Sequence, residues 1–468
     1  MKTLLKKTLI AVVFAVCLAS LVKADLPERI DAIISSQKGV RFSVRIIRAD
    51  SGKTVYSHKA TNALVPASNM KIIVTAAALK YLGPDYEYKT KVGLCGDTLV
   101  VIGSGDPLLG DERTDLKYGR ENDWIFKDIA ERLKRKHVQT INDIVVDTTV
   151  FDDERVHPSW PRDELNRWYA CEVSGLNFND NCIDVTAKNT GRRVAISIKP
   201  QTNFVEIVNE VVPISKGTSA VGAYRNRTPN KITIRGRCRK ETGPFYVAIE
   251  RPAAFFGVLL AENLARAGIN ATGQVVEKPV ADDCDVKVLA EYTTSIADCL
   301  ARCNKRSLNL AAEALLKTIA AKCNPTGKNG SWPDGRAKLS QYLLELGIDE
   351  DEFYIDDGSG LSRQNKLSAN ALAKVLFSIY KTKNWKLYKD SLAVGGVDGT
   401  IAKYFKDEKY KGKILGKTGY IRGVRSFSGT CSTADGDYIF SILTNKTNGQ
   451  TRKAIYDIAK AIVDHADI

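Results

Sequence analysis

The chain has 468 residues, more than a single hydrophobic core usually serves, so two or three domains are expected. Its hydrophobic fraction of 44% and charged fraction of 26% are ordinary for a globular protein and exclude a disordered or fibrous chain. The formal charge is +15, but no zinc-finger spacing and no interleaved basic and aromatic motif accompanies it, so nucleic acid is not an expected partner.

The first 24 residues have the layout of a secretory signal. A positively charged segment with Lys2, Lys6 and Lys7 precedes an apolar run over residues 9–22. Small or aliphatic residues follow at the positions that signal peptidase recognises. The run is shorter than the roughly 20 residues that a stable membrane-spanning helix needs. We therefore expect a cleaved signal peptide at 1–24 and an exported, periplasmic mature protein; a retained membrane anchor is the alternative.

The charge of the mature chain suggests where it works. The signal contains four lysines and no acid, so its removal leaves a formal charge of +11. A basic exported protein suits an anionic surface such as cell wall or lipid headgroups, which allows a loose association with a membrane surface. An equally simple interpretation is that the charge only keeps the protein soluble. The sequence leaves the oligomeric state open.

The cysteine count limits the disulfides. Of ten cysteines, nine remain after the signal, and an odd number leaves at least one without an intramolecular partner. An oxidising compartment permits disulfides. Cys299 and Cys303 lie one helical turn apart, and Cys171 and Cys182 flank a short segment, but the pairing stays open. The four scattered histidines and the lack of a Cys-x-x-Cys pair give little support to a metal site.

The beginning of the mature chain predicts helices around a β-hairpin. Residues 27–38 have the pattern of an amphipathic helix. Residues 40–48 and 54–58 predict two strands joined by a turn at Asp50-Ser51-Gly52. A second helix is expected over 69–82, where Gly83-Pro84 ends it.

The middle of the chain predicts separate modules. Residues 88–185 mix short strands with helices, including strands at 99–102 and 144–150 and a helix at 123–136. The following segment predicts only strands, and a helix follows it. The expected strands are 194–198, 204–208, 231–234 and 246–249, and the helix is 253–267.

The last part of the chain returns to helices and strands. Residues 290–345 and 368–383 predict helices, 438–443 a strand, and 450–465 a basic amphipathic helix, which is more often packed on a sheet than bound to a membrane. Since both ends of the chain combine strands with helices, one economical arrangement is a single α/β domain built from both ends, with the middle inserted. A string of independent domains is the alternative.

Two residues near the start of a predicted helix could perform acyl transfer. Ser68 and Lys71 have the spacing i and i+3, which places them on one helix face, and a buried lysine can act as a base. Spacing alone is weak, because Ser35-Ser36-Gln37-Lys38 has it too. The chain has only four histidines, and they are scattered, so the sequence gives little support to a Ser-His-Asp triad.

Two later motifs strengthen the case for Ser68. Ser307-Leu308-Asn309 lies between predicted helices, and Lys417-Thr418-Gly419 enters a predicted strand. The order Ser-x-x-Lys, Ser-x-Asn, Lys-Thr-Gly is that of active-site serine enzymes that react with penicillins. A second Ser-x-Asn, Ser368-Ala369-Asn370, begins a helix and is better explained as a cap.

The chemistry of amide cleavage explains these residue types. It needs a nucleophile, a base, a proton for the departing amine and an oxyanion site. We expect Ser68 to attack, Lys71 to take its proton, and Ser307 to relay a proton to the leaving nitrogen. Asn309 would hold Lys71 and the substrate amide, and Lys417 would lower the pKa of the amine. Farther along the same strand, Gly419 lets the backbone approach the substrate closely.

These motifs resemble the D-alanyl-D-alanine carboxypeptidase/endopeptidase family, the class C low-molecular-mass penicillin-binding proteins. The resemblance covers nearly the whole mature chain, and the long separation of Ser68 from Ser307 is unlike that of compact serine β-lactamases. Further matching segments are Gly103-Ser104-Gly105-Asp106-Pro107, Val173-Ser174-Gly175-Leu176, Asn179-Asp180-Asn181-Cys182-Ile183-Asp184-Val185, Asp357-Gly358-Ser359-Gly360-Leu361-Ser362-Arg363 and Gly396-Val397-Asp398-Gly399-Thr400.

The resemblance implies an α/β fold. It consists of a penicillin-recognising serine transpeptidase-like domain, an antiparallel sheet flanked by helices, with two nested inserted domains, one of them mostly β. We assign residues 25–87 and 288–468 to the catalytic domain, 88–187 and 251–287 to an inserted α/β domain, and 188–250 to a nested β-rich domain.

The resemblance also implies a function. The expected substrates are peptidoglycan stem peptides, cut at D-Ala-D-Ala or at a cross-link without metal or organic cofactor, and β-lactam antibiotics would acylate Ser68 as inhibitors. By similarity, the backbone N–H of Tyr420 joins that of Ser68 as an oxyanion donor, Thr418 binds the terminal carboxylate, and Arg363 contacts the stem peptide.

One position departs from the family pattern. The family usually has a small hydroxyl residue directly after Lys-Thr-Gly, where this chain has Tyr420, whose side chain would narrow the site. A β-lactamase, or a cell-wall-binding scaffold with weak catalysis, remains as an alternative function. Trp160 could stack on a stem peptide, although a buried tryptophan is the more common case.

Overall fold

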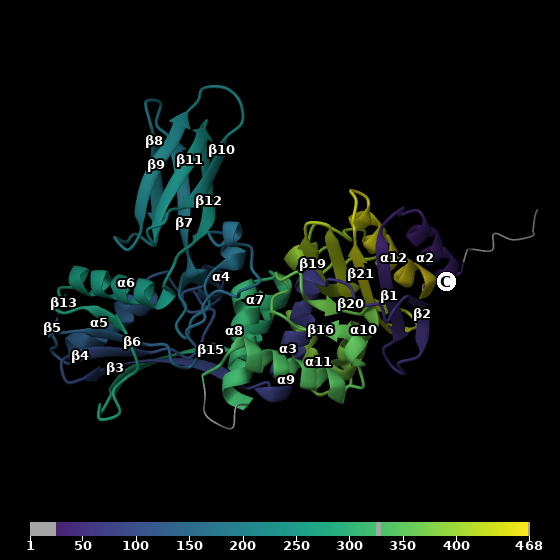
Figure 1. Cartoon of the computed structure of the whole chain (residues 1–468), viewed down its shortest axis with the longest axis horizontal. Coiled ribbons are helices and arrows are strands. Elements are labelled where there is room, and N and C mark those ends of the chain that lie inside the picture. Colours follow the sequence, from purple (N-terminus) through teal and green to yellow (C-terminus); the bar gives the residue numbers. More distant parts are fainter. Residues whose placement is uncertain (1–24, 324–328, 467–468) are drawn as a thin grey trace, which may run out of the picture.

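The structure, a computed structural model, describes residues 25–323 and 329–466, so the predicted signal at 1–24 lies outside the described residues. Figure 1 shows a helix-and-sheet body that contains both ends of the described chain, a second sheet beside it, and a β-rich module that projects from their junction. Within the described ranges, no helix has the length and apolar character required to cross a membrane.

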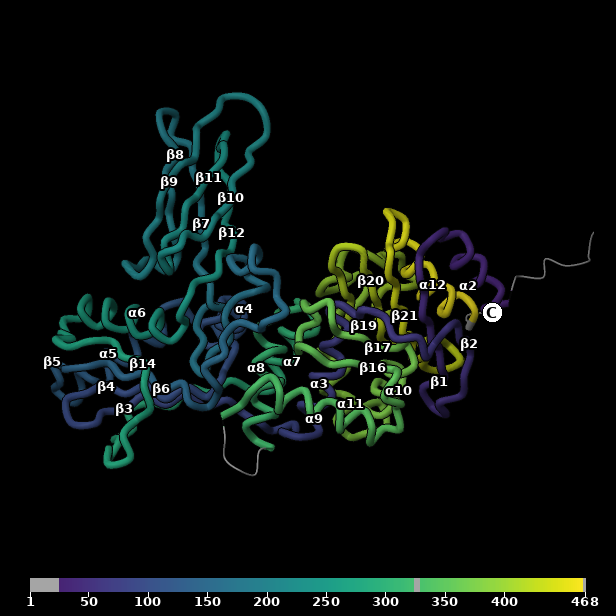
Figure 2. The backbone as a smooth tube through the Cα atoms, viewed as in Figure 1, coloured from purple at the N-terminus to yellow at the C-terminus, as the bar shows by residue number. Residues whose placement is uncertain are grey.

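The first body is built on a six-stranded antiparallel sheet that contains strands from both ends of the chain. Strand β1 (Arg41–Arg48) pairs with β21 (Gly436–Asn445) along its whole length, for example Ile46 with Phe440, so segments from the two ends of the chain lie side by side (Figure 2). The sheet order is β18 (Ala393–Val394), β19 (Ile414–Ile421), β20 (Val424–Thr433), β21 (Gly436–Asn445), β1 (Arg41–Arg48) and β2 (Thr54–His58).

Helices cover both faces of this sheet because successive side chains of a strand point to opposite sides. On β21, Phe440 and Ile442 pack under α2 (Leu26–Ser35) and α12 (Thr451–Ala466), whereas Ile439 and Leu443 pack against the other helices. These are α3 (Met70–Tyr81), α7 (Ile296–Lys305), α8 (Asn309–Cys323), α9 (Trp332–Glu345), α10 (Ala369–Tyr380) and α11 (Trp385–Ser391). A short pair, β16 (Phe353–Tyr354) and β17 (Lys366–Leu367), borders them.

The second sheet is mixed and lies in the inserted part of the chain. Its order is β14 (Val275–Glu277), β6 (Ile144–Asp147), β4 (Thr98–Ile102), β3 (Glu87–Cys95) and β15 (Lys287–Ser295). The neighbouring elements are α4 (Glu112–Lys117), α5 (Trp124–Arg135), α6 (Pro252–Arg266) and the short parallel pair β5 (Thr140–Ile141) and β13 (Asn270–Ala271). A disulfide joins Cys95 at the end of β3 to Cys284 before β15.

The projecting module consists of two three-stranded sheets. One is ordered β12 (Glu241–Ala248), β7 (Cys182–Asn189), β8 (Val194–Lys199), and the other β10 (Ala220–Arg225), β11 (Lys231–Cys238), β9 (Glu206–Pro213). Two short 3₁₀ turns, η3 (Trp168–Ala170) and η4 (Asn179–Asn181), lie in the segment that leads into this module. The apolar residues of the two inserted modules form one continuous core.

The prediction that the helical region begins at residue 290 is wrong. Residues 287–295 form β15, in which Ala290, Tyr292 and Thr294 point inward while alternate residues are exposed. This period of two and the β-branched and aromatic side chains favour a strand. The helix begins only after Ser295, whose side chain accepts a hydrogen bond from the Asp298 N–H as an N-cap.

The predicted domain borders stay predictions. Strand β7, which begins at Cys182, runs across the predicted border at 187/188, and β15 runs across the one at 287/288. We propose the ends of these strands, Cys182 and Ser295, as the borders at these two places. The strand predicted over 144–150 also ends early, since Asp147 turns the chain by accepting a hydrogen bond from the Thr149 N–H.

Candidate active site

Ser68 lies in a 3₁₀ turn, Ala67–Asn69, that leads directly into α3. Side-chain hydrogen bonds fasten this turn to the sheet. The Asn69 amide donates to the Lys417 carbonyl at 2.7 Å, and the Ser426 hydroxyl donates to the Pro66 carbonyl at 2.6 Å. The nucleophile candidate is therefore fixed between a helix start and the edge of β19.

Gly419 allows β19 to pass unusually close to Ser68. A Cβ at this position would lie 2.9 Å from the Ser68 backbone nitrogen and 2.8 Å from the Pro66 carbonyl oxygen. No side chain fits there. This close contact is with the protein's own backbone, and the predicted close approach to the substrate stays a prediction.

Lys71 is fully buried and points at Ser68. Its Nζ lies 3.1 Å from Ser68 Oγ and 2.7 Å from both Asn309 Oδ1 and the Ser359 carbonyl oxygen. These three partners carry no formal charge. Burial is the main cause that lowers the pKa of Lys71 to about 8.

Glu313 holds the loop that supplies the Ser359 carbonyl. Its buried carboxylate accepts hydrogen bonds from the backbone N–H of Gly358 at 2.9 Å and of Ser359 at 2.7 Å, and from the Trp332 indole at 2.8 Å. Glu313 lies one helical turn after Asn309 on α8. Asn309 and Glu313, neighbours on one face of α8, therefore fix the two oxygens at 2.7 Å from Lys71 Nζ: the Asn309 side-chain oxygen and the Ser359 carbonyl oxygen.

Lys417 and Ser307 form the second polar pair of the site. Lys417 is also fully buried, and its Nζ donates to Ser307 Oγ at 2.9 Å and to the Thr418 carbonyl at 2.7 Å. Burial lowers the pKa of Lys417 well below its usual range, and the positive charge of Lys71 lowers it further. Ser307 itself sits in a left-handed backbone conformation, with φ of 63°, between α7 and α8.

A cavity of about 480 Å³ opens over these residues, and we call it the catalytic cavity. Ser68, Ser307, Asn309, Arg363 and Tyr420 all line it. Lys71 and Lys417 lie beneath its surface. The structure thus brings together the predicted site residues from three distant motifs.

Of the predicted binding residues, Arg363 and Tyr420 line the catalytic cavity, and Thr418 is the neighbour of Lys417 on β19. Arg363 is exposed and donates to the Arg422 carbonyl at 2.8 Å. Tyr420 is 62% exposed, with the Arg425 guanidinium 4.5 Å from its ring centroid, so its side chain projects outward and does not fill the site. The Thr418 and Thr400 hydroxyls lie 2.8 Å apart.

Some residues of the site were not predicted. Glu164, Trp168 and Tyr169 line the catalytic cavity from the inserted module, and no motif indicated them. Glu313 had a usable signal, its position four residues after Asn309. Trp160 is 3% exposed and donates to Asp357 Oδ2 at 2.9 Å, which confirms the interpretation of a buried tryptophan.

The two duplicate motifs have other roles. Ser35 is an exposed residue near the end of α2, far along the chain from any of these contacts. Ser368 accepts a hydrogen bond from the Ala371 N–H at 2.8 Å and caps α10, as predicted.

The antiparallel sheet with flanking helices and nested insertions defines a penicillin-binding type of serine hydrolase fold, and the protein is a serine peptidase. Residues 26–466 match the family described as D-Ala-D-Ala carboxypeptidase 3 (S13), and the chain belongs to this family. The family and the fold class predicted from the sequence are confirmed.

Comparisons with known proteins agree with this assignment. The chain is 30% identical to the "D-alanyl-D-alanine carboxypeptidase" of Actinomadura sp. (strain R39) over 94% of this chain and 85% of that protein. The solved structure of penicillin binding protein 4 (dacB) from Haemophilus influenzae shares the fold, with a TM-score of 0.78, 21% identity, and coverage of 93% of this chain and 99% of that one.

Two further solved structures share the fold. One is the Haemophilus protein complexed with a novel β-lactam, with a TM-score of 0.72, 20% identity, and coverage of 93% and 99%. The other is Bd3459, a predatory peptidoglycan endopeptidase from Bdellovibrio bacteriovorus, with a TM-score of 0.51, 17% identity, and coverage of 92% and 94%.

Proposed function

We propose that this protein is a periplasmic D-Ala-D-Ala carboxypeptidase that also cleaves peptidoglycan cross-links, through an acyl-enzyme on Ser68. The observation that carries the proposal is the arrangement around Lys71. Its amine, buried and with a lowered pKa, lies 3.1 Å from Ser68 Oγ and has two further acceptors at 2.7 Å.

The hydrogen bonds of Lys71 favour a role as a base. A neutral amine has two N–H groups and one lone pair. When the N–H groups donate to Asn309 Oδ1 and the Ser359 carbonyl, the lone pair faces the Ser68 hydroxyl. Lys71 then takes the Ser68 proton as Ser68 Oγ attacks the carbonyl carbon of the penultimate D-alanine.

The remaining groups serve the tetrahedral intermediate. The backbone N–H groups of Ser68 and Tyr420 bind the oxyanion at the edge of β19. Ser307 accepts a hydrogen bond from Lys417, so it can pass its own hydroxyl proton to the departing nitrogen and take a proton from the Lys417 ammonium in return. The carbon–nitrogen bond breaks, D-alanine or the cross-linked amine leaves, and water then hydrolyses the ester on Ser68.

The relatives support the substrate class. The carboxypeptidase name of the Actinomadura relative supports action on D-Ala-D-Ala, and the endopeptidase named in the Bdellovibrio structure supports action on cross-links. The β-lactam complex of the Haemophilus protein supports acylation of Ser68 by such inhibitors. Thr418 and Arg363 would bind the terminal carboxylate and the stem peptide, and export by the signal at 1–24 would bring the enzyme to this substrate.

The nucleophile is tested by labelling with a fluorescent penicillin. The wild type and Ser35→Ala, which removes the serine of the duplicate Ser-x-x-Lys motif, should both give a covalent band. Ser68→Ala should give none. Equal labelling of Ser68→Ala and the wild type would refute the assignment of Ser68.

Two assays separate the proposal from its alternatives. Incubation with purified muropeptides should release D-alanine and cleave cross-linked dimers; a folded, penicillin-labelled protein that does neither would be a binding scaffold. Rapid and sustained nitrocefin turnover would instead identify a β-lactamase, because that activity requires fast deacylation.

A further inference from the structure

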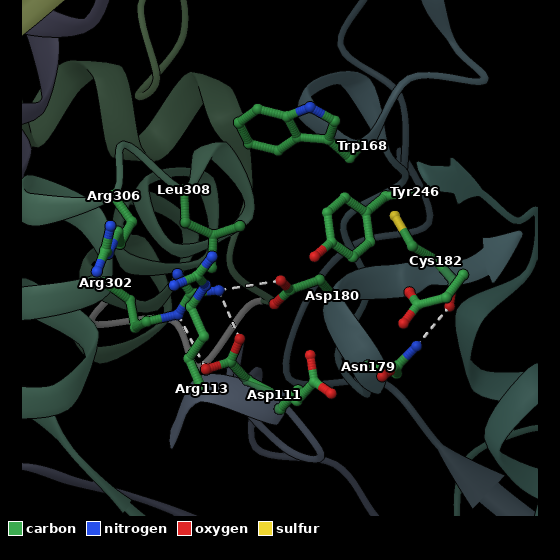
Figure 3. A pocket seen from close by; sticks show the side chains of 12 residues that line it. Asp111, Arg113, Trp168, Asn179, Asp180, Cys182, Tyr246, Arg302, Arg306 and Leu308 are labelled. Carbon is green, nitrogen blue, oxygen red and sulfur yellow. Dashed lines mark hydrogen bonds and ion pairs between the residues drawn. The ribbon is translucent and has the colours of Figure 1, made fainter. Parts of the chain in front are cut away.

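A second cavity lies where the catalytic domain and both inserted modules meet, and we call it the junction cavity. Its volume is about 260 Å³. Asp180, Trp168 and Tyr246 approach it from the inserted modules, and Arg302 and Leu308 from α7 and the loop after it (Figure 3). None of these five residues belongs to the proposed catalytic group.

The floor of the junction cavity is a buried charged network. The Arg302 guanidinium donates to both carboxylate oxygens of Asp111, at 2.5 and 2.9 Å, and to Asp180 Oδ2 at 3.0 Å (Figure 3). The other oxygen of Asp180, Oδ1, is buried and has no hydrogen-bond partner among the described residues. A buried polar atom normally has a partner. The neighbouring Asp111 carboxylate can be that partner only when one of the two carboxyl groups holds a proton, so a ligand N–H or O–H would satisfy the Asp180 oxygen better.

The wall of the junction cavity is aromatic. Tyr246 on β12 stands directly opposite Asp184 on β7 in the strand register, so both side chains are on the same sheet face. Tyr246 is 44% exposed and Trp168, on η3, is 37% exposed. Two accessible aromatic faces beside a carboxyl group form an amphipathic surface for a ligand with an apolar face and polar edges.

Charged side chains of both signs line the junction cavity, including Glu112, Arg113 and Arg306. The lining therefore does not select a ligand of one charge, and polar uncharged groups can bind to it. Burial raises the pKa of Asp180 to about 8 and that of Asp184 to about 6. Arg302 is already paired with Asp111 and Asp180. Hydroxyl and amide groups can hydrogen-bond to such a network without bringing a new charge into it.

The junction cavity adjoins the catalytic cavity. Trp168 lines both, and Leu308, which lines the junction cavity, stands between Ser307 and Asn309. The Asn309 amide also donates to the Tyr169 carbonyl at 2.7 Å, which holds η3 against α8. A molecule that reaches Ser68 can therefore extend past Trp168 into the junction cavity.

We propose that the junction cavity binds one N-acetylated amino sugar of the glycan strand to which the stem peptide is attached. The proposal rests on the proposed function, since it concerns the same substrate. A sugar ring has an apolar face for Trp168 and Tyr246, and hydroxyl and acetamido groups for Asp180 and Asp184. The cavity is slightly smaller than the roughly 300 to 1,000 Å³ of drug-sized sites, which suits one ring.

The reach of the substrate is compatible with this position. An extended peptide covers at most about 3.5 Å per residue. A stem peptide of a few residues therefore keeps its sugar close to the catalytic cavity whenever its end is at Ser68. Discrimination between substrates with and without sugar would come from the junction cavity.

The test compares two substrates in matched variants. Tyr246→Ala removes one aromatic wall, and Tyr224→Ala, another exposed tyrosine of the same β module, is the control. For a muropeptide that carries its sugars, Tyr246→Ala should raise KM about tenfold, the loss expected for one aromatic contact of about 1.4 kcal/mol. For the same stem peptide without sugar, KM should stay within about twofold of the wild type.

Further measurements make the outcomes distinct. Asp184→Asn, which alters the side chain less than Tyr246→Ala does, should also raise KM for the muropeptide with sugars and not for the bare stem peptide. Titration of the wild type with N-acetylglucosamine should quench tryptophan fluorescence through Trp168. Equal KM changes for both substrates, or none for either, would overturn the proposal. Loss of penicillin labelling and of all peptide turnover in the wild type would instead refute the proposed function.

Discussion

Two positions of helix α8 lie at buried lysines whose hydrogen-bond partners differ. Near its N-terminal end, Asn309 contacts Lys71, whose hydrogen-bond partners among the described residues are neutral oxygens. Two turns later on the same face, Lys317 is equally buried but donates to the Asp152 carboxylate at 2.6 Å and lies 3.9 Å from the Trp332 ring centroid.

The difference separates the lysine that we propose as the base from a structural one. Burial lowers the pKa of both lysines, but at Lys317 the Asp152 carboxylate favours the charged ammonium and fastens the inserted module to α8. In the described part of the chain, Lys71 donates to no carboxylate, and burial, partly offset by the charge of Glu313, lowers its pKa to about 8. Glu313, between Asn309 and Lys317 on α8, links the two regions because it orients the loop that faces Lys71.

The largest expected effect is that of Lys71→Arg. Arginine keeps the positive charge but does not lose its proton, so Ser68 would lack a base. We expect acylation by fluorescent penicillin to slow at least about a thousandfold, as for removal of a member of a catalytic group. Stopped-flow or gel labelling measures this. Wild-type labelling by Lys71→Arg would contradict the role of Lys71 as base.

The matching change at the structural lysine is Lys317→Met, which should affect stability and not catalysis. Removal of one partner of a buried ion pair costs about 3 to 5 kcal/mol, and the lower end is expected because the Asp152 side chain is 31% exposed and can reach water.

Urea unfolding measures the decrease in the free energy of unfolding of Lys317→Met. The double variant Lys317→Met/Asp152→Asn should recover part of this free energy. The acylation rate should remain within about threefold of the wild type. A Lys317→Met variant that is stably folded but no longer reacts with penicillin would contradict the prediction that Lys317 serves stability and only Lys71 serves catalysis.

The link between the regions is tested by Glu313→Gln. A glutamine has only one oxygen for three N–H donors, so the Ser359 carbonyl should shift from Lys71. We expect acylation to slow about ten- to a hundredfold, as for other residues that orient a functional group. The buried Glu352, which accepts from Ser368 and Asn370, provides the control Glu352→Gln.

A pH profile distinguishes positioning from simple destabilisation in Glu313→Gln. The negative charge of Glu313 raises the pKa of Lys71, so its removal should move the acid limb of the profile, where the rate rises with pH, to lower pH. An unchanged limb together with a reduced rate would mean that Glu313 has only a structural role.

In the wild type, the acylation rate should depend on the protonation of Lys71. Only the neutral amine accepts the Ser68 proton, and its fraction falls as pH decreases below the pKa of about 8. The rate should therefore decrease about tenfold per pH unit below that value. Penicillin labelling between pH 5.5 and 9 checks this, with Lys317→Met showing the same profile. A flat profile would exclude Lys71 as the titrating base.

The smallest effect is expected for Tyr420→Ser, outside both lysine regions. The backbone N–H of residue 420 remains, and the tyrosine side chain points outward. Penicillin acylation should change less than about threefold, while KM for peptides changes a few-fold as the mouth of the site widens. A loss above about tenfold would give the tyrosine side chain a direct part in the reaction.

The sequence predicted the three motifs because each has a fixed local spacing and a known chemical role. It also predicted strands from both ends of the chain, over 40–48 and 438–443, and these two strands pair in one sheet. Strand β15 escaped prediction because its alternation was masked by the helical patterns that follow. Glu313 was not found, since its function depends on a loop some 45 positions away.

The junction cavity was beyond sequence reasoning for a different reason. Asp180, Tyr246 and Arg302 come from three separate segments, and only the packing of the modules brings them together. The pairing of Cys95 with Cys284 likewise depends on β3 and β15 being neighbours, which no local pattern revealed.

The pairing of β1 with β21 has a consequence for biosynthesis. Val65, three residues before the proposed nucleophile Ser68, is held by Asn445 from 380 positions later, so Ser68 cannot be fixed until the last strand has paired. Contacts between such distant segments form slowly, after the inserted modules can already have folded on their own. On the proposed function, penicillin labelling would therefore report this last folding step, and chains that lack β21 should not react with the antibiotic.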